Sequence, residues 1–154
     1  MTVPSLVQNY QRQSYVTQLH KVYNELQQAF VQVVTENNAI DLREAGLGTQ
    51  TNIKPFLQNH FKVVQIGELD LSETPWGNVN YKNINGADYA YKGDWACGAC
   101  ATVASGAQIC LDNVNCYGYS YGGYSSNYGY IFVDVNGKKG PNIIGRDAFL
   151  MTYW

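Results

Sequence analysis

Four cysteines lie between positions 97 and 116, and their spacing allows disulfide, zinc or redox chemistry: Cys97, Cys100, Cys110 and Cys116. An even number of cysteines in a loop-rich region favours disulfide bonds and an oxidising compartment. Zinc is an alternative because Cys97 and Cys100 form a C-x2-C pair, but the five residues between Cys110 and Cys116 give no matching second pair. Redox-active or free thiols are a third alternative, although a thioredoxin-like motif opens a helix and this one lies among glycines. We therefore predict that the thiols are oxidised in pairs.

The pairing depends on the turn between the second and third cysteines. If Ser105-Gly106 is the turn of a hairpin, Cys100 and Cys110 lie nearly opposite each other. This geometry favours the nested pairs Cys100–Cys110 and Cys97–Cys116 over the sequential pairs Cys97–Cys100 and Cys110–Cys116.

A second stretch with chemical potential runs from Val133 to Phe149 and reads VDVNGKKGPNIIGRDAF. It begins like an EF-hand calcium loop, with Asp134 and Asn136 at the first and third ligand positions. Lysine stands at the fifth position and glycine at the twelfth, where oxygen ligands are needed, and two adjacent lysines repel a divalent cation. We therefore predict a structural turn at Asn136-Gly137 without a metal or other cofactor, and calcium held partly by backbone carbonyls is the alternative.

The segment from Tyr117 to Tyr130 contains six tyrosines, four glycines, three serines and one asparagine, and no charge. Gly118 to Gly122 matches the G-x-S-x-G nucleophile elbow of hydrolases, which requires a strand before the serine, a helix after it, and a histidine nearby. No helical pattern follows Ser120, and the only histidines, His20 and His60, lie far upstream. We predict a flexible surface loop instead.

Exposed tyrosines bury a large area on contact at low entropic cost, so this loop is also an expected interaction surface. The tyrosines expected to form it are Tyr119, Tyr121, Tyr124 and Tyr128.

Other catalytic motifs are absent from the sequence: it has no Walker loop, no G-x-G-x-x-G and no H-E-x-x-H. Ten basic and twelve acidic residues give a net charge of −2, and no basic face interleaved with aromatic residues indicates nucleic-acid binding. We expect neither an enzyme, with no catalytic residues assigned, nor a nucleic-acid partner.

The 154 residues fit one domain, which must position these groups. All 15 glycines follow Ala45, whereas Leu19, Tyr23, Leu26, Phe30 and Val33 recur at steps of four and three. This spacing predicts one long N-terminal helix over residues 1–37, with the stripe facing a sheet. Such a helix is roughly 50 Å long, whereas a compact domain of this size is about 40 Å across. We therefore expect the polar first half, Gln8 to Gln18, to be largely exposed.

Residues 38–98 are predicted to form a helix-and-loop region, and residues 99–154 a sheet with the cysteine and Tyr/Gly loops. Ala39 to Leu47 indicates a short helical turn, and Asn52 to Phe61 a short helix with Asn52 as its cap. Short strands rich in β-branched and aromatic residues are expected at Ala107 to Leu111, Tyr130 to Val135 and Ala148 to Trp154. One long helix followed by antiparallel strands predicts an α+β fold.

The stretch from Asp134 to Phe149 resembles a C-terminal motif of bacterial type IV pilin-like proteins, which carry a prepilin-type cleavage and methylation signal. The residues of the motif are Asp134, Asn136, Gly137, Gly140, Pro141, Asn142, Gly145 and Asp147. The sequences TVPSLVQNYQRQSYVTQLHKVYNELQQAF and NIKPFLQNHFKVV are similar to other parts of such proteins. The leader peptide and the apolar first half of a pilin helix are missing, so Met1 is interpreted as a start added to a shortened chain.

The resemblance implies a pilin-like fold and a structural role as a major or minor subunit of a type IV pilus-like filament. The implied partners are other pilin subunits, the inner-membrane assembly machinery and a surface or host ligand. It implies the inner membrane and an extracellular pilus, or a periplasmic pseudopilus, as the native location, and a soluble shortened form. The alternatives are a pseudopilin of type II secretion and a disulfide-stabilised extracellular adhesion or carbohydrate-binding module.

Overall fold

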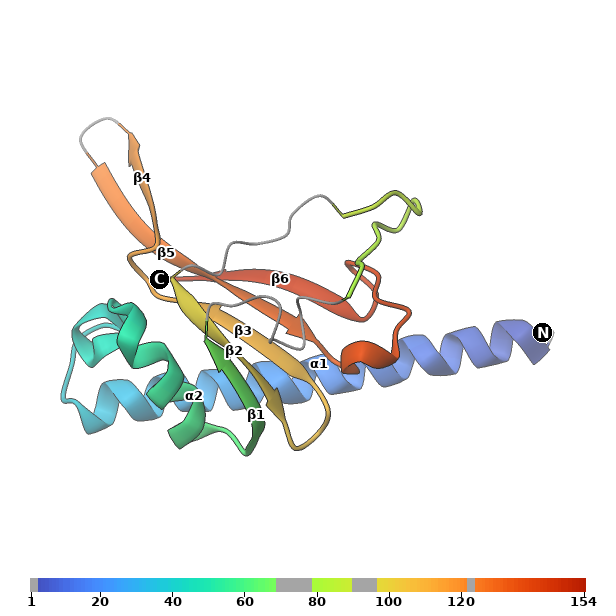
Figure 1. Cartoon of the computed structure of the whole chain (residues 1–154), viewed down its shortest axis with the longest axis horizontal. Helices are drawn as coiled ribbons and strands as arrows, with labels where there is room; N and C mark the ends of the chain where they lie inside the picture. Colours follow the sequence, from blue (N-terminus) through green and yellow to red (C-terminus); the bar gives the residue numbers. More distant parts are fainter. Residues whose placement is uncertain (1–2, 69–78, 90–96, 122–123) are drawn as a thin grey trace.

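The computed structural model of the chain describes residues 3–68, 79–89, 97–121 and 124–154. In these ranges the elements are α1 (Val3–Glu36), the helical turns η1 (Arg43–Leu47) and η2 (Gln50–Asn52), α2 (Ile53–His60), β1 (Val63–Glu68), β2 (Gly98–Val103), β3 (Gln108–Asp112), β4 (Tyr117–Tyr121), β5 (Tyr124–Asp134), the turn η3 (Gly137–Lys139) and β6 (Ala148–Tyr153). Helix α1 runs along an antiparallel sheet and extends past it at the N-terminal end (Figure 1). The predicted α+β class, with a long N-terminal helix and an antiparallel sheet, is confirmed.

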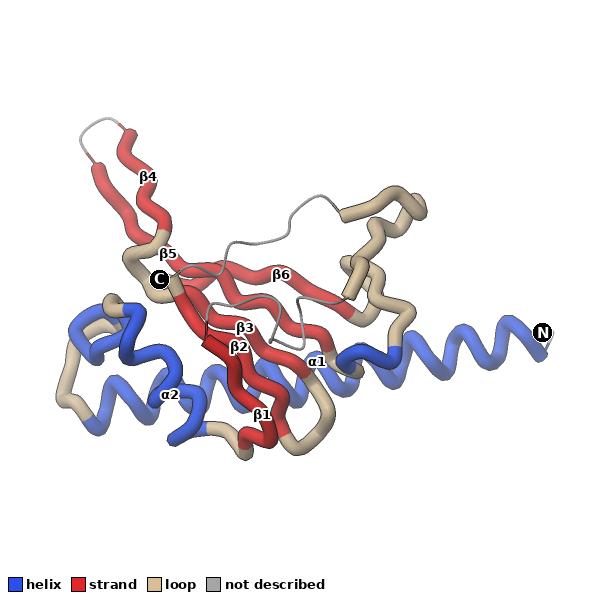
Figure 2. Tube along the Cα trace, viewed as in Figure 1, coloured by secondary structure: helices blue, strands red, loops and turns tan. Residues whose placement is uncertain are grey.

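The six strands are hydrogen-bonded in the order β1-β2-β3-β5-β4, and β6 pairs with β5 (Figure 2). Strand β5 is the longest, with 11 residues, because its two halves have different partners. Residues 131–134 pair with β3, and residues 124–128 pair with β4. As a result the β4–β5 hairpin projects from the body of the sheet (Figure 1).

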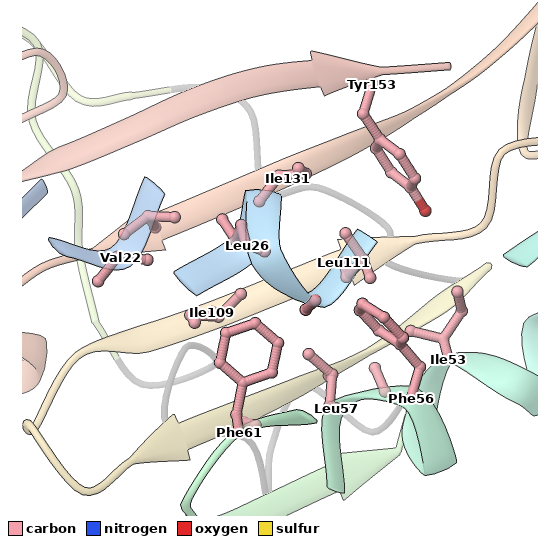
Figure 3. Close-up of a cluster of buried hydrophobic side chains, with 14 of the residues drawn as sticks. Val22, Leu26, Ile53, Phe56, Leu57, Phe61, Ile109, Leu111, Ile131 and Tyr153 are labelled. Atoms are coloured by element: carbon pink, nitrogen blue, oxygen red, sulfur yellow. The ribbon is translucent and has the colours of Figure 1, made fainter. Parts of the chain in front are cut away.

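Side chains alternate between the two faces of each strand, so each strand supplies both layers of the interior. On the face toward α1, the aliphatic side chains of β3 and β5 meet the helix, as Figure 3 shows for Val22, Leu26, Ile109, Leu111 and Ile131. On the opposite face, which we call the outer face, a second cluster contains Tyr81, Cys100, Cys110, Phe132 and Ala148.

The second half of α1 buries one narrow stripe against the sheet, made of Val22, Leu26, Ala29 and Val33. The predicted stripe was correct for Leu26 and Val33 and wrong for Tyr23, which is 44% exposed and accepts a hydrogen bond from Gln27 Nε2 at 2.8 Å. Leu19 and Phe30 lie at the margin of the stripe, half-buried against the core. Val22 and Ala29 are small, and small side chains let a helix approach a sheet closely.

The segment after α1 holds the predicted helical turn, η1, and the predicted short helix, α2. Asn52 does not cap α2 with its side chain. Its Nδ2 donates to the carbonyl oxygen of Gly46 at 2.9 Å. Gly46 has a φ of 103°, a non-helical backbone conformation inside η1. The predicted helix-and-loop region also contributes an edge strand of the sheet, β1, which pairs with β2.

Candidate functional site

The cysteines form the two nested disulfides Cys97–Cys116 and Cys100–Cys110. Val103 and Ala107 close the predicted turn with a backbone hydrogen bond of 2.9 Å, which places Cys100 opposite Cys110 in the β2–β3 register. The inner bond is buried on the outer face, whereas Cys97 and Cys116 are half-buried. The two bonds therefore join the β2–β3 hairpin at the middle of its strands and at its open end, and among the described residues no cysteine is free.

The stretch from Asp134 to Asp147 folds around two fully buried carboxyl groups. The hydroxyl of Tyr81 donates to Asp134 Oδ2 at 2.6 Å, and the backbone N–H of Asn136 donates to Oδ1 at 3.2 Å. Burial raises the pKa of Asp134 to about 6, although these two hydrogen bonds act in the opposite direction. Burial and the neighbouring Asp134 also raise the pKa of Tyr81, so the tyrosine stays protonated and donates.

Asp147 holds the other end of the same stretch. Its two carboxyl oxygens accept the backbone N–H groups of Asn142, at 2.8 Å, and Ile143, at 2.7 Å. Its own carbonyl oxygen accepts the backbone N–H of Val135 at 2.9 Å. The acidic residues of the motif thus satisfy backbone donors of a tight loop, as buried carboxylates commonly do.

Steric constraints explain why glycine occupies three positions of the motif in this loop. Gly137, Gly140 and Gly145 all have positive φ values, and so does Asn142. At Gly137, where φ is 61°, a Cβ atom would lie 2.8 Å from the carbonyl oxygen of Gly106 in the β2–β3 turn. A side chain at position 137 would therefore separate the loop from the disulfide-bonded hairpin.

Pro141 continues the loop after a cis peptide bond with Gly140. Asn136 Nδ2 donates to the carbonyl oxygen of Gly140 at 2.7 Å, so the expected turn at Asn136-Gly137 is present and closed by its own side chain. In the described parts of the chain, no group of three or more His, Cys, Asp or Glu side chains could hold a metal ion. Calcium binding here stays a hypothesis for experiment.

The predicted flexible Tyr/Gly loop was wrong in its local structure, because the segment is the β4–β5 hairpin. Tyr117 pairs with Tyr128 and Tyr121 with Tyr124 in its register. Alternating tyrosines with high β propensity on both arms favour pairing over a loop. Gly122 and Gly123 lie outside the described residues.

Three tyrosine rings form a cluster at the base of this hairpin. Tyr117 stacks on Tyr128 with ring centroids 5.7 Å apart, and Tyr130 packs against both, at 4.8 Å from Tyr117 and 5.5 Å from Tyr128. Of the four tyrosines predicted as an interaction surface, Tyr128 therefore belongs to this cluster. The side chains of the other three, Tyr119, Tyr121 and Tyr124, lie outside what the structure describes.

The G-x-S-x-G match has no elbow geometry at its serine. Ser120 lies inside β4 and pairs with Ser125 on β5, whereas a nucleophile elbow needs a sharp turn into a helix. His60 packs its ring against Phe56 at 4.9 Å, and His20 is exposed on α1.

Sequence reasoning missed a buried acid at the end of β3. Asp112 is fully buried two residues after Cys110, and neither carboxyl oxygen has a hydrogen-bond partner among the described residues. Burial raises its pKa to about 7. The hydroxyl of Tyr153 donates to the backbone carbonyl of Asp112, not to its carboxyl group. The sequence signal was the regular alternation of β3, which places Asp112 on the same face as Cys110.

Two exposed features were also missed. The first turns of α1 expose an apolar stripe formed by Val3, Leu6, Val7 and Tyr10, which are 50–74% exposed. A cleft of about 680 Å³ lies beside the base of the hairpin and is lined by Asp41, Arg43, Val114, Asn127, Tyr128, Tyr130, Thr152 and Trp154. The stripe follows from spacing along one helix, whereas the cleft unites segments that are far apart in the sequence.

In the described residues, none of the helices combines the length and the apolar character needed to cross a membrane. Comparisons of the chain with protein-family models, with curated proteins and with solved structures gave no match.

Proposed function

We propose that this chain is a structural subunit, a major or minor pilin, of a type IV pilus-like filament. The observation that carries the proposal is the exposed apolar stripe of Val3, Leu6, Val7 and Tyr10 on the projecting half of α1. Apolar residues at helical spacing are normally buried against a partner. The residues spaced four, three and four apart in the second half, from Val22 to Val33, are buried by the sheet.

The partner that fits the stripe is the equivalent helix of neighbouring copies. A helix that is continuous through both halves can be anchored in its own domain by one half and pack on other subunits by the other half. The first 18 residues contain a single charged side chain, Arg12, so close packing between helices there would bury little charge. The resemblance of residues 134–149 to the C-terminal motif of pilin-like proteins supports the same function.

A pseudopilus of type II secretion uses the same architecture and is the alternative within this class. An extracellular adhesion or carbohydrate-binding module is the alternative from another class, and the cleft beside the hairpin favours it. Assembly, adhesion, motility, uptake and secretion are all activities that such a filament could serve. The inner membrane and the cell surface are the locations that follow from the proposal.

The experiment is expression of the complete gene in its own bacterium. The protein should enter the membrane fraction and then a sheared surface-filament fraction. Val7→Asp should remove it from the filament fraction because it places a charge in the proposed helix contact. Val31→Asp is the matched control, since Val31 is 68% exposed on the half of α1 that packs on the sheet.

Two results would contradict the proposal. One is a processed full-length protein that is released as a secreted monomer and never sediments with filaments. The other is an equal loss of filament incorporation in both variants while circular dichroism shows a native fold, because the stripe would then have no special role.

A further inference from the structure

The cleft beside the hairpin combines aromatic side chains with both charges. Tyr128 and Tyr130 come from β5, and Trp154 follows β6. Asp41 lies between α1 and η1, and Arg43 is the first residue of η1. Val114, which is buried, also lines the cleft. Its volume of about 680 Å³ falls in the about 300–1,000 Å³ range of ligand sites.

The aromatic side chains that line the cleft are unusually exposed to solvent. Trp154 is 80% exposed, although an indole ring is a large apolar surface that folding normally removes from water. Tyr130 and Tyr128 are half-buried and hold each other edge to face, with an interplanar angle of 82°. The cleft thus presents an exposed indole ring beside two tyrosine rings whose orientation is fixed by neighbouring rings.

Its polar wall offers both donors and acceptors. Asp41 supplies carboxylate oxygens, one of which also accepts the Glu44 backbone N–H at 2.7 Å, and Arg43 supplies guanidinium donors. The opposite charges have consequences for selectivity. An anionic ligand would face the Asp41 carboxylate and a cationic ligand the Arg43 guanidinium, so a neutral ligand rich in hydroxyl groups suits the pair best.

The cleft is also held in shape by side-chain amides. Asn115 Nδ2 donates to the carbonyl oxygen of Gly48 at 2.8 Å, while its Oδ1 accepts Asn127 Nδ2 at 3.1 Å. The backbone N–H of Val114 donates to the carbonyl oxygen of Leu47 at 2.9 Å. These bonds connect the segment after Arg43 to the base of the hairpin, and the disulfide of Cys116 lies next to them. A site that is already formed loses less entropy on binding.

We infer that this cleft binds a neutral saccharide, with Trp154 and Tyr130 against the C–H face of a sugar ring and with Asp41 and Arg43 hydrogen-bonded to its hydroxyls. The C–H groups of a pyranose ring form an apolar face, and each hydroxyl both donates and accepts, which matches the two walls. The volume accommodates more than one sugar unit. The inference uses only the cleft and stands whether or not the chain forms filaments.

The test is saturation-transfer NMR on the purified full chain with lactose, maltotriose and chitotriose as neutral probes and 3′-sialyllactose as the anionic one. At least one neutral probe should bind with a dissociation constant below about 10 mM, a weak affinity of about −2.7 kcal/mol. Trp154→Ala and Arg43→Gln should each weaken that binding about tenfold or more. Both residues lie at the surface, and circular dichroism should show both variants folded.

Val64→Ala is the control, because Val64 is 72% exposed and lies on β1, at the opposite end of the strand order from β5. It should leave the affinity unchanged. The inference is overturned if no neutral probe binds up to about 10 mM, if only 3′-sialyllactose binds, or if binding survives both cleft variants. It is also overturned if the chain dimerises through this surface, seen as a concentration-dependent mass that Trp154→Ala abolishes.

Discussion

The two faces of the sheet are built from different kinds of side chain. The face under α1 is aliphatic, with Ile109, Leu111, Ile131 and Val133 in contact with the helix. The outer face carries the Cys100–Cys110 disulfide and three fully buried acids: Asp112, Asp134 and Asp147.

The difference separates two sources of stability. Burial of aliphatic side chains is insensitive to pH and to reductant, because no group titrates or reacts. The stability contributed by a buried carboxyl group changes with pH, and the stability contributed by a disulfide is lost when a reductant cleaves it. The outer face is therefore where conditions outside the molecule should change its stability, and the helix face is where they should not.

The largest expected effect is loss of the disulfides. Replacing both cysteines of a pair by alanine should lower the free energy of unfolding by about 3 kcal/mol for either pair, since the closed loops have 19 and 10 positions. Urea denaturation measures this. A mild reductant should open Cys97–Cys116 first because its sulfurs are less buried. Reduction of Cys100–Cys110 first, free thiols in the unreduced protein by maleimide labelling, or one equivalent of zinc would contradict this account.

The second largest effect is expected from truncating a buried side chain on the helix face of the sheet. Leu26→Ala should lower the free energy of unfolding by about 2–5 kcal/mol, equally at pH 5 and pH 8, because Leu26 is 2% exposed. Leu6→Ala is the matched control on the same helix. Leu6 is 51% exposed, so its loss should change stability by less than about 0.5 kcal/mol in the isolated chain. Equal effects at the two leucines would mean that the stripe from Val22 to Val33 does not face the core.

Two of the buried acids, Asp112 and Asp134, should make stability fall as pH rises. The pKa of Asp112 is raised to about 7 and that of Asp134 to about 6, so between about pH 4 and pH 7 the folded chain retains protons that the unfolded chain releases. This contribution is complete below the ordinary carboxyl pKa and is lost as pH rises through the raised values. For Asp112 it amounts to up to about 4 kcal/mol. Asp112→Asn should remove this contribution. The measurement is the free energy of unfolding of the wild type minus that of the variant, which should be larger at pH 5 than at pH 8. A difference that does not change with pH would show that Asp112 is not held neutral.

The smallest expected effect is that of EDTA. Asp134 and Asp147 accept hydrogen bonds from Tyr81 and from backbone N–H groups, so the loop needs no cation to hold its shape. The melting temperature should be unchanged by EDTA. A bound calcium at 100 times its dissociation constant would add about 2.7 kcal/mol, so a clear EDTA-dependent drop would show that the outer face has a metal site after all.

Features that depend on local spacing could be predicted from the sequence. The long helix, the exposure of Gln8 to Gln18, the Ser105-Gly106 turn and the nested disulfides each follow from residues that are close along the chain. The predicted orientation of α1 was wrong at one position, because Val22 and not Tyr23 is buried against the sheet. Val22 and Tyr23 both fit a stripe that includes Leu26, and only contact with the sheet decides between a small side chain and a large one.

The remaining features depend on partners that are distant in sequence. Asp112 looks like an ordinary strand end until Gly98 of β2 lies opposite it in the sheet. The glycines and serines of residues 117–130 suggest a loop, but the pairing of alternating tyrosines across two arms outweighs them. The cleft beside the hairpin could not be predicted at all, because Arg43, Tyr130 and Trp154 come together only after the chain has folded.

The nested disulfides also decide how the chain responds to a pulling force. Cys97 and Cys116 are 19 positions apart, and an extended chain spans at most about 3.3–3.6 Å per residue, so the bond withholds about 65 Å of chain from extension. The inner bond lies wholly within that segment and does not shorten the extended molecule further. Tension applied between α1 and β6 would pass from one side of the β2–β3 hairpin to the other through the sulfur atoms of Cys97 and Cys116. The hairpin would stay closed while the rest of the sheet was drawn apart, and it would serve as a fixed nucleus on which the strands could pair again when the load is released.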